Sequence, residues 1–131
     1  MATQALVTIQ KILVRKSETY GALGEPGASA EWDVRFTVAG QQYRNRFDDV
    51  RDGSVVTVNK SLLVDLGPLE NLRIEMTGNE IDDTSANDQF PAMEHIITPA
   101  TNWREGQTYT VDAGSHPDFA YAVVFDIRRA A

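Results

Sequence analysis

Residues 32–47 read W-D-V-R-F-T-V-A-G-Q-Q-Y-R-N-R-F, and this stretch decides the fold class. Its first half alternates tryptophan, valine, phenylalanine and valine with aspartate, arginine and threonine. Alternation with a period of two places one face of a β-strand in a core and the other face in solvent. A turn at residues 39–42 then leads into a second short strand over residues 43–47. The stretch therefore predicts a β-hairpin.

Other runs along the chain show the same period. They cover residues 5–15, 56–66, 72–77 and 118–128. The first run changes face between Ile9 and Ile12, and a bulge near Gln10–Lys11 would reconcile its two halves. Turn-forming residues separate the runs, and no long amphipathic helix is present. About eight strands joined by short loops predict an all-β fold, an eight-stranded antiparallel β-sandwich that forms a single domain over residues 1–131.

Composition narrows the classes of function. The chain of 131 residues has 19 acidic and 12 basic side chains, and its net charge of −7 argues against nucleic-acid binding, which needs a basic surface. It has no cysteine, which excludes disulfides, zinc–thiolate sites and thiol catalysis. The N-terminus shows no secretory signal, and no apolar run has the length of a membrane span. We therefore expect a cytoplasmic location, with export by a signal-free route left open.

The acidic residues gather in three of the predicted loops, over residues 16–30, 48–53 and 78–88. These loops follow the first, third and fifth strands, and alternate connections of an up-and-down chain emerge at the same end of a sandwich. Carboxylates crowded at one end repel one another, and a divalent cation would remove that repulsion. Calcium binds about six to eight oxygen ligands, which carboxylates on loops commonly supply. This end is therefore a candidate calcium site.

Five carboxylates have the most informative spacing. The candidate metal ligands are Glu25 and Glu31, six residues apart, and Glu80, Asp82 and Asp88, at positions 0, +2 and +8 of a second segment. The alternative is that acidic residues favour turns and exposed loops for conformational reasons. In that case both segments are solvated loops that hold no metal.

The sequence resembles a known family along most of residues 5–128. The run E-P-G-A-S-A-E-W-D-V-R-F at residues 25–36 resembles the first calcium loop and the following strand of C2 domains. The run L-R-I-E-M-T-G-N-E-I-D-D-T-S-A-N-D at residues 72–88 is similar to a later strand and the third loop of that family. The run V-N-K-S-L-L-V at residues 58–64 resembles the strand with a polar N-x-x-aromatic pattern.

The resemblance implies a C2-like sandwich in the circularly permuted topology, whose extra strand is C-terminal, here at residues 118–128. It also implies calcium as the bound ion, with the five carboxylates named above on the acidic positions of the two loops. Three of them are Glu where the family has Asp. Trp32-Asp33 stands where the family often has Pro-Tyr, and Pro91 stands where it has Gly.

The function that the resemblance implies is a non-enzymatic module that binds a protein partner or a second copy, or docks peripherally on an acidic membrane through calcium. Arg44, Arg46 and Arg51 are the basic candidates for holding lipid headgroups. The alternative is a calcium-independent structural or adaptor sandwich within a larger assembly. A hydrolase has the least support, because His95 and His116 show no acid–nucleophile constellation, and we expect no catalytic residues.

Overall fold

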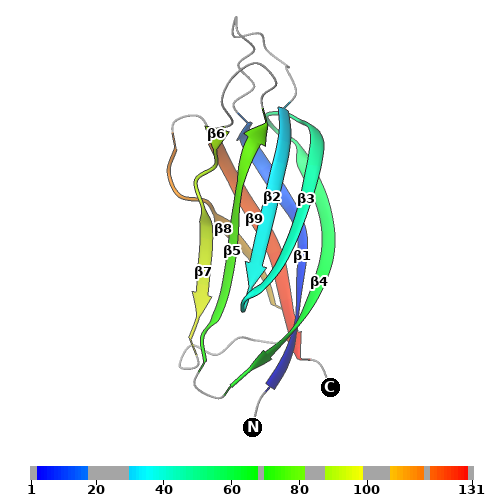
Figure 1. Ribbon diagram of the computed structural model, residues 1–131, viewed down its shortest axis with the longest axis vertical. Helices are drawn as coiled ribbons and strands as arrows, with labels where there is room; N and C mark the ends of the chain where they lie inside the picture. Colours follow the sequence, from blue (N-terminus) through cyan, green and yellow to red (C-terminus); the bar gives the residue numbers. More distant parts are fainter. Residues whose placement is uncertain are drawn as a thin grey trace, which may run out of the picture.

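The computed structural model describes residues 3–17, 30–67, 70–81, 88–98, 107–116 and 119–129, most of which lie in β-strands (Figure 1). The strands are β1 (Thr3–Ser17), β2 (Ala30–Val38), β3 (Gln41–Val50), β4 (Val55–Leu66), β5 (Leu72–Ile81), β6 (Asp88–Gln89), β7 (Met93–Ile97), β8 (Gln107–Asp112) and β9 (Phe119–Arg129). Within these ranges, no helix has the length and apolarity needed to cross a bilayer.

Two antiparallel sheets face each other. One has the strand order β4-β1-β9-β8, and the other has the order β3-β2-β5-β6 with β7 also paired to β5. Glu80 of β5 pairs with Asp88 of β6, and Met76 of β5 pairs with Met93 of β7, so β6 and β7 fill one position at the same edge of β5. Two sheets of four strand positions confirm the predicted eight-stranded all-β sandwich.

The order of the chain agrees with the permuted topology that the resemblance implies. β1 leads into the first acidic segment, and β9 is added beside it, where the two strands pair along most of their length. Ala5 of β1 pairs with Arg129 of β9. Both ends of the described chain therefore lie at the same end of the sandwich, away from the acidic segments (Figure 1).

The predicted change of face in the first strand is confirmed as a bulge. The register of β1 against both neighbours shifts between Ile9 and Lys11. Ile9 and Ile12 are both fully buried because the extra residue re-aims the second half of the strand. The bulge thus allows a run with two parities to line one core.

The hairpin turn is shorter than the sequence predicted. Val38 pairs directly with Gln41, so the turn consists of Ala39 and Gly40 rather than residues 39–42. Their φ angles of 48° and 85° are both positive, which is the conformation of tight two-residue hairpins. β3 is longer than the predicted strand at 43–47 because this turn keeps the two strands paired from its first residue.

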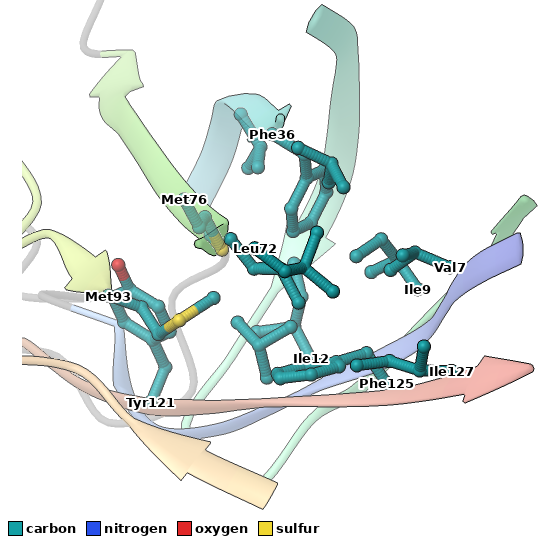
Figure 2. Close-up of a cluster of buried hydrophobic side chains, with 14 of the residues drawn as sticks. Val7, Ile9, Ile12, Phe36, Leu72, Met76, Met93, Tyr121, Phe125 and Ile127 are labelled. Atoms are coloured by element: carbon teal, nitrogen blue, oxygen red, sulfur yellow. The ribbon is translucent and has the colours of Figure 1, made fainter. Parts of the chain in front are cut away.

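The core fills the space between the sheets (Figure 2). Side chains from both sheets meet there: Val7, Ile9, Ile12, Tyr121, Phe125 and Ile127 from one sheet, and Phe36, Leu72, Met76 and Met93 from the other. Burying each large apolar side chain contributes roughly 1.5–3 kcal/mol.

Lys60 interrupts the apolar pattern of β4, and its ammonium lies 5.1 Å from the centre of the Tyr43 ring, a cation–π contact.

Gly78 of β5 lies against the backbone of β2, where no side chain fits. A Cβ atom added to Gly78 would lie 2.2 Å from the backbone oxygen of Asp33, and backbone cannot move aside as a flexible side chain can. We expect Gly78→Ala to lower the free energy of unfolding by about 1–3 kcal/mol in chemical denaturation. Gly114→Ala is the control, since its Cβ would meet its nearest neighbour at an ordinary 3.7 Å. Equal losses in the two variants would contradict this account.

Candidate functional site

The acidic segments begin and end at one end of the sandwich, as predicted. Ala30 pairs with Val50 and Glu31 pairs with Ile81, so β2 joins the ends of β3 and β5 at this point. The turn between β3 and β4 lies beside β1, because the backbone N–H of Gly53 donates to the carbonyl of Val14 at 2.8 Å. Strands that flank all three segments therefore converge at the upper end in Figure 1.

The predicted ligands are only partly within the described residues. Glu25 and Asp82 lie outside them, as does the side chain of Asp88, whose backbone is described. The backbone of Asp88 pairs with that of Glu80, and Glu80 pairs on its other side with Trp32. Glu80 is 9 % exposed. Three neighbouring strands thus place Glu80 and Asp88 in one row at the acidic end.

Glu31 and Glu80 leave opposite faces of their sheet. Trp32 and Glu80 form a directly opposed pair, so Glu31, one residue earlier, projects from the other face. A carboxylate oxygen of Glu31 lies 3.7 Å from a guanidinium nitrogen of Arg46 on that outer face. Among the described residues, no group of three acidic or histidine side chains is placed to hold a metal. The fold brings these segments together but separates Glu31 from Glu80.

An aromatic cluster lies beneath the acidic end. The Trp32 ring is 4.2 Å from Phe90, 6.2 Å from Phe119 and 5.7 Å from Tyr121, measured between ring centres. Tyr121 donates a hydrogen bond to the carbonyl of Pro91 at 2.5 Å, and burial raises the pKa of its hydroxyl. The cluster therefore fills the core directly beneath the acidic end.

Trp32 carries an unsatisfied donor in this cluster. Its ring is fully buried, yet its indole N–H has no hydrogen-bond partner among the residues that the structure describes. A buried unpaired donor costs about 1–3 kcal/mol. The alternation of residues 32–38 predicted Trp32 on the core face of its strand, and its burial confirms this, but the alternation gave no sign of the buried indole N–H.

A ladder of ion pairs covers the outer face of β2 and β3. Arg44 donates to both carboxylate oxygens of Asp33, at 2.9 and 2.5 Å. These hydrogen bonds, together with the charge of the guanidinium, hold the pKa of Asp33 below its ordinary value. With Arg46 beside Glu31, both strand arginines predicted to hold headgroups already have acidic partners.

A shallow polar hollow lies beside this ladder and was missed by sequence reasoning. Its lining comes from three adjacent strands and from β6: Asp33, Arg35, Arg44, Thr77, Gly78, Asn79 and Gln89. The alternation in β2 held a signal for this hollow, because the polar residues between the core residues must all lie on the outer face of the sheet. The register between strands, which decides what they meet, is not visible in a single run.

Both histidines contact aromatic rings. The His95 ring is 5.5 Å from Tyr109 and 6.0 Å from Phe125, between ring centres. The His116 ring is 5.2 Å from that of Phe119.

Comparison with known proteins identifies the fold. No family model matches the chain, and no curated protein matches it. Solved structures do match: the C2A domain of a plant extended synaptotagmin 1 has a TM-score of 0.58 and 8 % identity, with 98 % of this chain and 96 % of that chain covered. A C2 domain protein from Ramazzottius varieornatus has a TM-score of 0.54 and 8 % identity, with coverage of 99 % and 90 %.

Human GIVD cytosolic phospholipase A2 also matches, with a TM-score of 0.60 and 12 % identity. The match covers 99 % of this chain but only 17 % of the enzyme, so the likeness concerns one small part of that protein. At these identities the comparisons establish the C2-like fold and leave the function to the residues of this chain.

The Asp33–Arg44 pair predicts a pH dependence. Because the folded-state pKa of Asp33 is lowered, its stabilisation is present above the unfolded value near 3.8 and is lost as the pH falls through the folded value. In denaturant titrations we expect Arg44→Gln to be less stable than wild type at about pH 6, and the difference to shrink as the pH falls below the unfolded value. Arg51→Gln is the matched control, since its partner Asp49 is 67 % exposed. Parallel pH profiles for wild type and Arg44→Gln would refute this role.

Proposed function

We propose that this C2-like β-sandwich is a non-enzymatic binding module that takes up calcium between its acidic segments and then binds a partner. The supporting observation is the row in which Trp32, Glu80 and Asp88 pair across β2, β5 and β6, directly beside the end of the first acidic segment. Oxygen ligands of this kind suit calcium, which tolerates irregular and flexible cages.

The ligand set that we propose centres on Glu80 and Asp88, with Asp82 from the segment that joins them and Glu25 from the first segment. Glu80 is nearly buried at the end of the sandwich where the acidic segments begin and end. A cation bound there would offset the repulsion between the acids of these segments. Glu31 joins this set only if its ion pair with Arg46 opens, so we assign it a peripheral role.

The aromatic cluster packs beneath the same end of the sandwich. A binding site needs a well-packed base, and Trp32, Phe90 and Phe119 pack at the point where the acidic segments begin and end. The indole N–H of Trp32 has no partner among the described residues, so it can donate a hydrogen bond to a carbonyl or carboxylate oxygen at the acidic end. The indole fluorescence of Trp32 is therefore a direct reporter of events at this end.

We propose that the partner is a protein rather than a membrane. Arg44 and Arg46 are already engaged by Asp33 and Glu31, which leaves less positive charge for lipid headgroups. The competing function is a calcium-independent adaptor, for which the described residues offer the ion-pair ladder as a contact surface. Gel filtration with calcium and with chelator separates the two, because only the calcium-dependent module changes its partner binding.

Calcium is expected to stabilise the protein. At calcium about a hundredfold above Kd, one site adds about 2.7 kcal/mol to the free energy of unfolding and raises Tm by about 10 °C. Asp82→Asn combined with Asp88→Asn should abolish the rise, whereas Asp65→Asn combined with Glu70→Gln, the same charge change on exposed residues away from this end, should preserve it. An unchanged melting curve of the wild type would remove the calcium proposal.

The position of Glu31 gives a second test of the ligand set. In a Trp103→Phe background, calcium titration of the remaining Trp32 fluorescence should give a weaker Kd for Glu80→Gln by about tenfold or more, and a smaller change for Glu31→Gln. Magnesium serves as the competing ion. A larger loss in Glu31→Gln than in Glu80→Gln would show that the cage forms on the outer face instead.

A further inference from the structure

One edge strand of the sandwich is regular and uncharged along most of its length. β8 ends the strand order β4-β1-β9-β8, and among the described strands it pairs only with β9. Its register against β9 is continuous from Gln107 to Asp112, and none of these residues has a positive φ. The stretch from Gln107 to Val111 has no charged side chain. Such an edge can accept a further strand.

The other described edges are protected against an added strand. β3 and β4 each have a non-glycine residue with positive φ at a break in register, Asp49 at 59° and Asn59 at 48°. The position beside β5 is divided between the short strands β6 and β7. Bulges and short edge strands both hinder edge pairing. Among the described edges, β8 is the one without such a device.

The pairing of β8 shows which of its backbone groups face the open edge. Ala113 continues the register opposite Tyr121, and its N–H donates to the carbonyl of Tyr121 at 2.9 Å. Bonded and unbonded pairs alternate in an antiparallel ladder, so the odd-numbered residues of β8 bond to β9. The N–H and C=O groups of Thr108, Thr110 and Asp112 therefore point away from β9, and these three residues are exposed.

Gly114 supports this assignment and limits the open stretch. Its N–H, which has the same parity, donates to the carbonyl of Ala92 at 3.1 Å. The chain just before β7 thus already occupies the edge beside Gly114. The part of the edge that remains open runs from Thr108 to Asp112.

The core is incompletely covered at the same edge. Val123 and Phe125 of β9 are fully buried, whereas Val111 and Tyr109, which pair with them on the same face, are only partly buried. The ring of His95, from the other sheet, lies 5.5 Å from that of Tyr109 between centres. A further strand would place its own side chains beside Tyr109 and Val111 and remove apolar surface from water.

We propose that β8 binds an extended segment of a partner protein, which adds antiparallel to it as the next strand of the sheet. Every described pair in this sheet is antiparallel. In that direction the segment exchanges backbone hydrogen bonds with Thr108, Thr110 and Asp112, and its intervening side chains lie beside Tyr109 and Val111. The segment is therefore apolar at every second position. Basic residues at its ends suit a chain of net charge −7.

A second copy of β8 fits this edge less well than a short segment does. An antiparallel copy centred on Thr110 would carry the residues before its own Gln107 past Gly114 and onto Ala92, which already occupies the edge. A segment of a partner can end before that point. The edge contains none of the carboxylates of the proposed calcium ligand set, so binding there should be the same with calcium and with chelator.

Peptide binding tests the edge. The probe is the fluorophore-labelled peptide K-T-V-T-V-T-K, whose valines lie opposite Tyr109 and Val111 in the proposed pairing. N-methylation of its threonines removes the N–H groups that face β8, and fluorescence anisotropy should then show binding at least about tenfold weaker. N-methylation of its valines, whose N–H groups face away, should preserve binding. No binding of the parent peptide, or a loss with methylated valines that equals the loss with methylated threonines, would overturn the proposal.

Variants of Thr110 test the same bonds from the side of the protein. Thr110→Pro removes the N–H that faces the open edge and no bond to β9, so the variant should fold and bind the parent peptide at least about tenfold more weakly. Thr110→Val keeps the N–H and should bind as wild type does. Unchanged binding by folded Thr110→Pro would contradict the proposed pairing, and the methylated peptides test it independently of how this variant folds.

Amide hydrogen exchange tests whether the edge is open and what occupies it. Without peptide, the amide hydrogens of Thr108 and Thr110 should exchange faster than those of Tyr109 and Val111, and the peptide should slow them. Slow exchange at Thr108 and Thr110 without peptide would overturn the proposal. If that protection increased with protein concentration, the occupant would be a second copy of the chain.

Discussion

The antiparallel pairing of β2 with β5 is the constraint on which the rest of this structure depends. It sets Trp32 opposite Glu80 and Glu31 opposite Ile81, and so decides which carboxylate enters the sandwich and which remains outside. The close approach at Gly78 fixes that register, because a side chain there would collide with the neighbouring backbone. The aromatic cluster, the polar hollow and the row of Glu80 and Asp88 all include residues that this register places.

Local physics made much of the fold predictable from the sequence. Alternation with period two identified the main strands, and the parity change of residues 5–15 located the bulge, because each depends only on neighbours along the chain. The meeting of the three acidic segments at one end was also predictable, since antiparallel strands return the chain to the same end. The short turn at Ala39-Gly40 was missed, because an alanine with positive φ is an uncommon choice.

The candidate site was predictable only in outline. Whether Glu31 and Glu80 share a face depends on the register between strands, and a shift of one residue reverses the answer. The same limit concealed the bidentate contact between Asp33 and Arg44, which joins residues that are diagonal in the ladder. In β9, residues on both faces are apolar, so the sequence did not distinguish Ala122 and Val124 on the outer face from the core residues between them.

The location of the chain ends has a practical meaning. Ala5 and Arg129 lie side by side at the end remote from the acidic segments. An affinity tag, a fluorophore or a solid support attached through either terminus would leave that far tip unobstructed. The domain can therefore be immobilised through either terminus without covering the acidic end, where binding is to be measured.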